Sequence, residues 1–306
     1  MGHISNRLFP VPEDQLGAAR SWVEHGERTP VKPRLASSVV LIRDAPPGTE
    51  TYLSYRRGES PLGIVAFPGG SIEESDDDDV VWFGPTPAQW AKAMGIDDLF
   101  VARRHVVGAI RELFEETGVL LAGPDAVSLV DGSRSPEWMK AREDIATQER
   151  SFSDILARRG LGLRTDLLKP LAHWLSPDYA HRRFDTHYFA AAQPTGQEAT
   201  ALASKGLWGE WRCASREVAK AEATTLGDEV GQPNTVGRAL DELTVPAVRL
   251  ILEKIGSSKG CVAYLSHKRP MKVYYPHLMT PSEEADPMLE VACSVATEGG
   301  SGQRGR

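Results

Sequence analysis

One segment of the sequence, residues 106–119, combines a helical hydrophobic period with three carboxylates on its polar side. At about 100° per residue, Glu112, Glu115 and Glu116 fall within an arc of about 100° on a helical wheel. The apolar residues occupy the opposite side of that wheel: Val106, Val107, Ile110, Leu113 and Phe114. The pattern predicts a helix over 106–117 that packs one face on a sheet and presents an acidic face.

The three carboxylates have two interpretations. Like charges one helical turn apart repel by roughly 0.2–0.5 kcal/mol, and a solvated acidic surface is the ordinary explanation of such a face. Two features weaken that explanation: Arg111 stands beside Glu112, where it can orient carboxylates, and the helix follows, after an insertion, a strand that ends in a Gly-Gly loop. Clustered carboxylate oxygens suit hard cations such as Mg²⁺ or Mn²⁺. The helix alone leaves both a metal site and a solvated surface open.

The rest of the chain predicts a mixed α/β protein. Residues 36–43 and 51–56 are typical of a β-hairpin around the Pro-Pro-Gly turn at 46–48. Thr86 followed by Pro87 predicts a helix start. Further strands are expected at 64–67, 170–175, 183–190 and 207–212, and helices at 135–159, 216–222 and 235–255, the last interrupted at Pro246. Because strands and helices do not alternate strictly, an α/β sandwich with a mixed sheet fits better than a doubly wound parallel sheet.

Two stretches together resemble the signature of the Nudix hydrolases, G-x5-E-x7-R-E-U-x-E-E-x-G-U, where U is a bulky aliphatic residue. Residues 67–70 (FPGG) open the pattern, and residues 111–119 (RELFEETGV) close it in every defined position. Asp76 stands where the pattern has Glu, and the segment from Asp77 to Ile110 exceeds the seven residues that the pattern places before its Arg by about 27. This long insertion resembles the branch that includes the peroxisomal coenzyme A diphosphatases, as do residues 109–121 and 182–189.

The resemblance implies a Nudix-type α/β/α sandwich with helical insertions. It places a single Nudix domain at residues 35–280, after an N-terminal extension at 1–34. One insertion, at about 77–104, lies inside the Nudix signature, and a helical insertion lies at about 135–160. The Gly-rich composition of residues 299–306 predicts a flexible C-terminal tail over 281–306.

The activity implied by the resemblance is hydrolysis of the diphosphate in a nucleoside diphosphate linked to another moiety, with Mg²⁺ or Mn²⁺ as cofactor. Glu112, Glu115 and Glu116 would hold the metal, with the carbonyl of Gly70 as a further ligand. Arg111 would position the carboxylates. Glu112 would activate the water, with a loop carboxylate outside the signature as the alternative base.

The substrate-binding residues expected from the resemblance are Arg56, Arg57, Phe67 and Gly69, although a plain surface pair is the ordinary explanation of the two arginines. Coenzyme A or acyl-coenzyme A is the first substrate class, followed by ADP-ribose, NADH or FAD. A non-catalytic, regulatory Nudix-fold protein that binds a ligand is the alternative from another class. The four-residue set of Arg111 and three glutamates disfavours that alternative, because a protein without catalysis has no chemical need for all four.

Several other residues have ordinary structural explanations. Asp76 is either part of the Nudix signature or one of four solvated aspartates, and solvation is favoured. Pairing with Asp185 is the expected role of the arginines at 182 and 183. The aromatic residues of the insertion are expected to pack it onto the domain: Trp82, Phe83 and Trp90. Three histidines show no metal-ligand spacing and are expected to be core or surface residues: His173, His181 and His187.

The length and net charge of the chain limit which kinds of domain organisation and binding partner remain to be considered. A chain of 306 residues suits one domain with insertions, and its net charge of −7 disfavours general binding to nucleic acid. The three cysteines are far apart, which argues against disulfides and favours a reducing, cytoplasmic location. The sequence has no run of about 18 apolar residues, so no transmembrane helix and no membrane association are expected. The expected partner is a small nucleotide-derived substrate, and the resemblance leaves a homodimer open.

Overall fold

The protein is organised around a mixed eight-stranded sheet. The computed structural model describes residues 4–26, 28–46, 48–58, 60–131, 135–202, 204, 206–267, 271–282 and 285–294. The main path of the sheet runs in the order β11 (Gly209–Cys213), β3 (Gly48–Tyr55), β2 (Arg34–Ala45), β10 (Phe184–Ala192), β9 (Lys169–Leu175) and β12 (Val273–Tyr274). Two short strands extend it, with β4 (Val65–Ala66) on β3 and β5 (Gly69–Ser71) on β2.

The strand directions confirm the predicted mixed sheet. Strands β2 and β3 pair antiparallel up to Ala45 and Gly48, as the predicted hairpin requires. Strand β10 runs parallel to β2 and antiparallel to β9. A parallel neighbour needs a long crossover connection, and the chain between β2 and β10 supplies it with the helices of one face.

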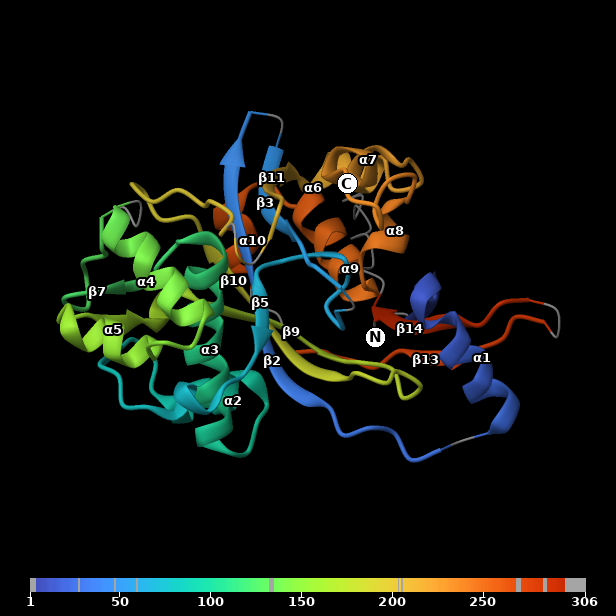
Figure 1. Ribbon diagram of the computed structural model, residues 1–306, viewed down its shortest axis with the longest axis horizontal. Helices are drawn as coiled ribbons and strands as arrows, with labels where there is room; N and C mark the ends of the chain where they lie inside the picture. The colour runs from blue at the N-terminus through green and yellow to red at the C-terminus, as the bar shows by residue number, and fades with distance from the viewer. Residues whose placement is uncertain are drawn as a thin grey trace, which may run out of the picture.

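Both faces of the sheet are covered by helices (Figure 1). Along β2, Val39 and Leu41 point into one core, while Val40 and Ile42 point into the other. One core is covered by α2 (Pro87–Met94), α3 (Leu99–Thr117), α4 (Pro136–Ala146) and α5 (Phe152–Arg158). The other is covered by α6 (Ala214–Ala219), α9 (Pro246–Gly256) and α10 (Cys261–Ser266), with α7 (Thr225–Val230) and α8 (Leu240–Leu243) beside them. A central strand buried on both sides explains the continuous apolar run of β2.

Helix α3 is longer than the predicted helix at 106–117. It begins after Asp98, whose carboxylate accepts hydrogen bonds from the backbone N–H groups of Phe100 and Val101 at 2.8 and 3.3 Å. It ends at Gly118, which has the left-handed conformation that favours glycine, with φ of 76°. The extra turns come from the end of the insertion, so the inserted residues continue the helix instead of forming a separate loop.

The insertion packs onto the domain through Trp90, as expected from its aromatic residues. Thr86 caps α2 by accepting a hydrogen bond from the N–H of Gln89 at 3.3 Å, which confirms the predicted helix start. The buried ring of Trp90 meets Phe189 of the central sheet edge to face, with 5.8 Å between centroids. The insertion also supplies β6 (Trp82–Phe83), which pairs in a small sheet with β8 (Gly162–Arg164) and, through it, β7 (Ala122–Gly123).

We expect Trp90→Leu to lower the free energy of unfolding by about 1–3 kcal/mol, because leucine leaves part of the buried site unfilled. Urea denaturation followed by circular dichroism measures this loss. Phe100→Leu is the matched control, since Phe100 is 67% exposed and its replacement should change stability by less than about 0.5 kcal/mol. Equal losses in the two variants would show that the insertion is not anchored by Trp90.

The N-terminal and C-terminal parts of the chain meet in a third sheet. Strand β1 (Ile4–Pro10) pairs antiparallel with β14 (Met288–Ser294), which also pairs with β13 (His277–Met279). The predicted tail over 281–306 is therefore wrong for residues 288–294. Leu289 and Val291 alternate into the core and make this segment a strand, whereas the prediction rested on the composition of residues 299–306, which lie outside the described residues.

Residues near the N-terminus also contribute to the core. After β1, a short 3-10 helix η1 (Glu13–Gln15) leads into α1 (Leu16–His25). Phe9, Val11 and Ala19 are buried against the core that includes α9. The described part of the chain holds no helix long and apolar enough to cross a membrane.

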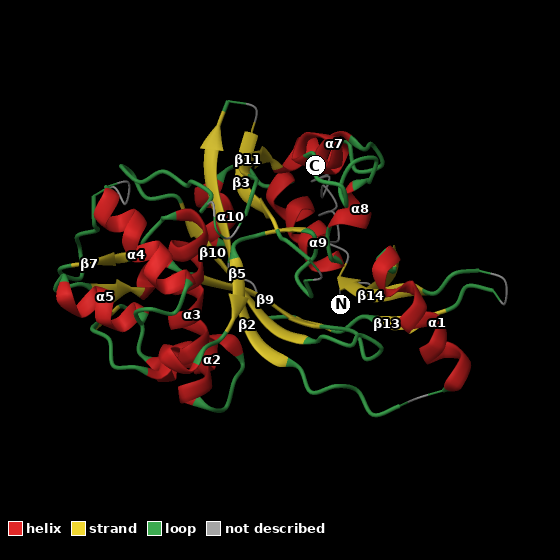
Figure 2. Cartoon of the chain, viewed as in Figure 1, coloured by secondary structure: helices red, strands yellow, loops and turns green. Residues whose placement is uncertain are grey.

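Figure 2 shows the resulting layers, with the strands of the central sheet between two groups of helices. The layered, mixed sheet confirms the predicted α/β sandwich. The single helical stretch predicted at 135–159 is divided in the structure into α4 and α5, which are separated by a turn. Pro246 is the first residue of α9, so the predicted interruption falls between α8 and α9.

Candidate functional site

The Gly-Gly loop and helix α3 lie in direct contact. Gly69 and Gly70 begin β5, which pairs with Ser37 and Ser38 of β2. A Cβ atom at Gly70 would lie 2.4 Å from Oε1 of Glu112, and one at Gly69 would lie 2.4 Å from the carbonyl oxygen of Ser37. At Gly69 the contact is with backbone, so only glycine permits this approach, whereas at Gly70 a side chain would displace the carboxylate of Glu112. The two halves of the signature, far apart in sequence, therefore form one site.

Arg111 is the centre of this site and is only 1% exposed. Its Nε and Nη2 donate to the two carboxylate oxygens of Asp76 at 2.8 and 3.0 Å. Its Nη1 donates to Oε1 of Glu112 at 2.9 Å, and Nη2 also donates to the carbonyl of Ser71 at 2.9 Å. Burial alone would lower the pKa of Arg111, but the charges of Glu112, Asp76 and Glu73 hold it well above its ordinary value. Arg111 thus orients carboxylates on two separate elements.

Asp76 does not belong to the solvated part of its aspartate run. It lies in the 3-10 helix η2 (Glu74–Asp77), is fully buried, and accepts a hydrogen bond from the N–H of Glu73 at 2.9 Å in addition to the two from Arg111. The favoured expectation of a solvated Asp76 is wrong. The signal available in the sequence was its position six residues after Gly70, where the Nudix pattern has Glu; Asp77 and Asp79 are exposed.

Glu116 faces Arg56 across the Gly-Gly loop. Nη2 of Arg56 lies 3.0 and 3.1 Å from the two carboxylate oxygens of Glu116. Oε2 of Glu116 also accepts hydrogen bonds from the N–H of Gly69 at 3.3 Å and from Oγ of Ser54 at 3.4 Å. Arg56 donates further to the carbonyls of Phe67 and Gly69. The guanidinium expected to meet substrate is thus held against the loop and the carboxylate.

Glu115 takes a different position from the other two glutamates. It is buried and accepts a hydrogen bond from Nη1 of Arg111 at 3.4 Å. It is absent from the lining of the cavity into which Glu112 and Glu116 face. Of the three carboxylates that share a helical face, two reach this cavity and one lies beneath it.

The cavity has a volume of about 380 Å³ and is lined by both carboxylates and guanidinium groups. The carboxylates come from Glu73, Glu112 and Glu116, and the backbone of Gly69 and Gly70 also lines the cavity. Guanidinium groups also line the cavity: Arg56, Arg57 and Arg182. Aromatic and small residues complete its wall: Tyr55, Phe184, Trp208, Ser54 and Ser71. A site with carboxylates and arginines together can hold a polyanion through a cation and through direct charge pairing.

Phe67 and Arg183 make packing and pairing contacts in the structure. The ring of Phe67 is fully buried, packs edge to face on Tyr188 at 6.4 Å between centroids, and is absent from the cavity lining, so contact between Phe67 and substrate stays a prediction. Arg183 pairs with Asp178 at 2.7 Å and not with Asp185. An ion pair of Arg183 with an aspartate was predicted correctly, but the partner Asp178 lies in the turn before β10, whereas the expected partner Asp185 lies on β10 itself.

Arg142 is a buried residue of this region that sequence reasoning missed. It projects from α4 and donates to the carbonyl of Glu115 at 3.1 Å, and to the carbonyl and hydroxyl of Thr200 at 2.8 and 3.2 Å. Burial lowers its pKa to about 10. A cation there supports the C-terminal end of α3, where the helix dipole is negative. The sequence carried no signal for this role beyond an arginine in a predicted helix.

The oxygen donors of the site fit a hard divalent cation. Glu112, Glu116 and Gly70 lie together at the cavity, and carboxylate and carbonyl oxygens are the ligands that Mg²⁺ and Mn²⁺ prefer. Glu73, which the sequence analysis did not single out, adds a carboxylate 3.7 Å from Nη1 of Arg111. The residues present therefore suit the cofactor that the signature implies.

The structure is similar to that of a Nudix hydrolase from Alicyclobacillus acidocaldarius, with a TM-score of 0.59 and 23% identity over 78% of this chain and 98% of that one. A MutT Nudix hydrolase from Burkholderia pseudomallei aligns with a TM-score of 0.33 and 15% identity, over 73% and 98%. A UDP-X diphosphatase gives 0.33 and 10%, over 86% and 76%. No protein-family model and no curated protein matches the sequence. The first similarity shows that the chain has the Nudix fold.

Proposed function

We propose that this protein is a Nudix hydrolase that cleaves the diphosphate of a nucleoside diphosphate linked to another moiety. The observation that carries the proposal is the cavity in which Glu112 and Glu116 share one space with Arg56, Arg57 and Arg182. Three arginines can neutralise the charge of a diphosphate, while the carboxylates can reach it only through a cation. An uncharged ligand would need neither set.

In this proposal each residue has a limited task. Glu112, Glu116 and the carbonyl of Gly70 hold Mg²⁺ or Mn²⁺, with Glu115 as a supporting carboxylate; when bound, the cation neutralises phosphate charge and lowers the pKa of water. Glu112 takes the proton of the attacking water. That water adds to one phosphorus, and the bridging oxygen leaves with the other, which gives two phosphate monoesters.

The proposed substrate class is coenzyme A or acyl-coenzyme A, before ADP-ribose, NADH or FAD. The resemblance to the long-insert branch supports this order, and the basic residues Arg56 and Arg57 stand where that branch meets substrate phosphate. Aromatic side chains of Phe184 and Trp208 on the cavity wall suit either a nucleobase or a pantetheine arm. A ligand-binding regulator with the same fold is the second possibility.

A substrate panel tests the proposal. Coenzyme A, ADP-ribose, NADH, FAD and nucleoside triphosphates are each incubated with the protein and Mg²⁺ or Mn²⁺, and the products are separated by anion-exchange chromatography. We expect coenzyme A or its acyl esters to give the highest kcat/KM. Turnover of none of them, with binding of one detected by calorimetry, would replace the enzyme with the regulator. A higher kcat/KM for ADP-ribose would retain the hydrolase and change its substrate.

A further inference from the structure

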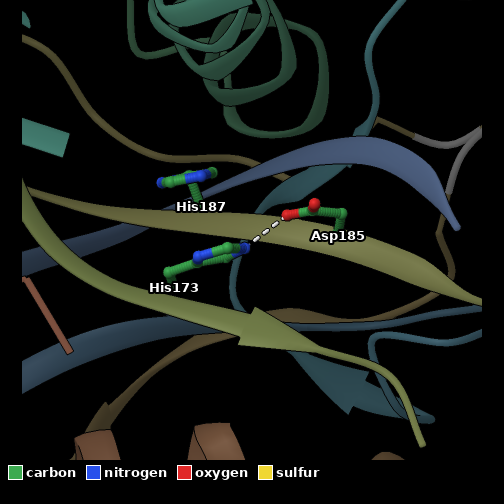
Figure 3. Close-up of side chains that lie close together, drawn as sticks. All are labelled: His173, Asp185 and His187. Atoms are coloured by element: carbon green, nitrogen blue, oxygen red, sulfur yellow. Dashed lines mark hydrogen bonds and ion pairs between the residues drawn. The ribbon is translucent and has the colours of Figure 1, made fainter. Parts of the chain in front are cut away.

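A second group of metal-binding side chains lies on the central sheet, apart from the cavity. His173 of β9 and His187 of β10 are direct cross-strand partners, and Asp185 stands two residues before His187 (Figure 3). One ligand atom from each of the three lies within 4.8 Å of the others. None of the three lines the 380 Å³ cavity.

The sheet itself brings these side chains together. Residues two apart on a strand point to the same face, and the residue directly opposite on the neighbouring strand has its Cβ about 5 Å away. Asp185, His187 and His173 occupy these three positions. No metal-ligand spacing is evident in the sequence because the three side chains come from two strands, and the register of those strands is visible only in the fold.

The three side chains are in direct contact with one another. Nε2 of His173 lies 2.5 Å from Oδ1 of Asp185. The imidazole rings of His173 and His187 stack with 4.2 Å between centroids. His187 is 2% exposed, and among the described residues its Nδ1 has no hydrogen-bond partner. A buried polar atom without a partner costs roughly 1–3 kcal/mol, so packing alone does not explain an imidazole at this position.

The ring of His187 is enclosed between the rings of two other histidines, His173 on one side and His105 on the other. His105 of α3 covers the other side of His187 at 4.5 Å between centroids and is itself anchored through Nδ1 to Oγ of Ser37 at 3.0 Å.

We propose that His173, Asp185 and His187 form a second metal site that takes Zn²⁺, with water as the fourth ligand. Two imidazoles and one carboxylate suit Zn²⁺ and not Mg²⁺. The side chains of His173 and Asp185 are 20% and 27% exposed, which leaves room for water at the outer side of the site. Bonds of about 2.0–2.1 Å would draw the ligand atoms closer together than they are here. The ion would link β9 to β10 and contributes nothing to diphosphate cleavage.

Titration of metal-free protein with Zn²⁺ and with Co²⁺ tests this site. Calorimetry gives the affinity for Zn²⁺, and visible absorption tells whether Co²⁺ is four-coordinate with nitrogen ligands or six-coordinate with oxygens. The background is Glu116→Gln, which weakens binding at the diphosphate cavity. We expect one Zn²⁺ per chain and the intense bands of four-coordinate Co²⁺ in this background.

Variants at the partly exposed ligands decide the assignment. Asp185→Asn and His173→Asn should each lower the Zn²⁺ affinity at least about tenfold, and the Co²⁺ bands should weaken. His181→Asn is the matched control, because His181 is exposed and lies outside the cluster; it should change neither. Unchanged Zn²⁺ affinity in Asp185→Asn and His173→Asn, absence of Zn²⁺ binding, or a six-coordinate Co²⁺ spectrum would overturn the proposal. Circular dichroism confirms that each variant is folded.

Discussion

Glu116→Gln is expected to lower kcat/KM for the best diphosphate substrate by at least about 100-fold. The substitution keeps the size of the side chain and removes one negative charge from the carboxylates at the cavity. Glutamine is a far weaker ligand for a hard cation than carboxylate, so the charge of the diphosphate is less well neutralised. Initial rates over a range of Mg²⁺ or Mn²⁺ concentrations measure the effect.

The metal dependence of the same variant separates two explanations. Partial recovery at high metal concentration is expected if Glu116 holds the cation. Glu137→Gln, at an exposed position of α4, is the matched control and should retain full activity. Near-normal kcat/KM in a folded Glu116→Gln protein would place the metal elsewhere in the molecule.

Asp76→Asn is expected to lower the free energy of unfolding by about 3–5 kcal/mol, because it removes the charge of one partner in a buried ion pair. Arg111 now donates to both carboxylate oxygens of Asp76. An amide offers one acceptor oxygen and turns an NH₂ group, itself a donor, toward the guanidinium or toward the N–H of Glu73. Urea denaturation at neutral pH measures the loss.

The other aspartates of the run provide the control for this experiment. Asp79 is exposed, and Asp79→Asn removes the same charge at the surface, where the expected change is within about 0.5 kcal/mol. A loss of the same size in both variants would attribute the effect to the net charge of the run. A small loss in Asp76→Asn alone would mean that Arg111 is held mainly by Glu112 and the carbonyl of Ser71.

The parts of the site that follow from local periodicity could be predicted from sequence. The helical period placed Glu112 and Glu116 on one face of α3, and both line the cavity. The depth of Glu115 could not be predicted, because it depends on what packs against the helix. Asp76 and Arg111 are 35 residues apart, so their pairing depends on the path of the insertion, and the one sequence signal for it was the position of Asp76 six residues after Gly70.

The fold could be predicted from the sequence to a similar extent. Turn residues and apolar runs identified the hairpin of β2 and β3, and a mixed sheet followed from the irregular order of elements. Strand β14 was missed because its two inward residues, Leu289 and Val291, form a short pattern whose partner β1 lies at the other end of the described chain. The histidine cluster was missed for the same reason, since strand registration is a long-range property.

The pairing of β1 with β14 has a consequence for the order in which the protein forms. Strand β1 precedes every other described strand in the chain, and its Arg7 is opposite Val291 of β14. During synthesis β1 can therefore pair with β14 only when nearly all other described residues have been made. Closing so long a loop costs entropy and slows folding. We therefore expect the central sheet to assemble while β1 is still unpaired. At that stage the exposed strand of a nascent chain can bind chaperones or pair with other strands in non-native contacts.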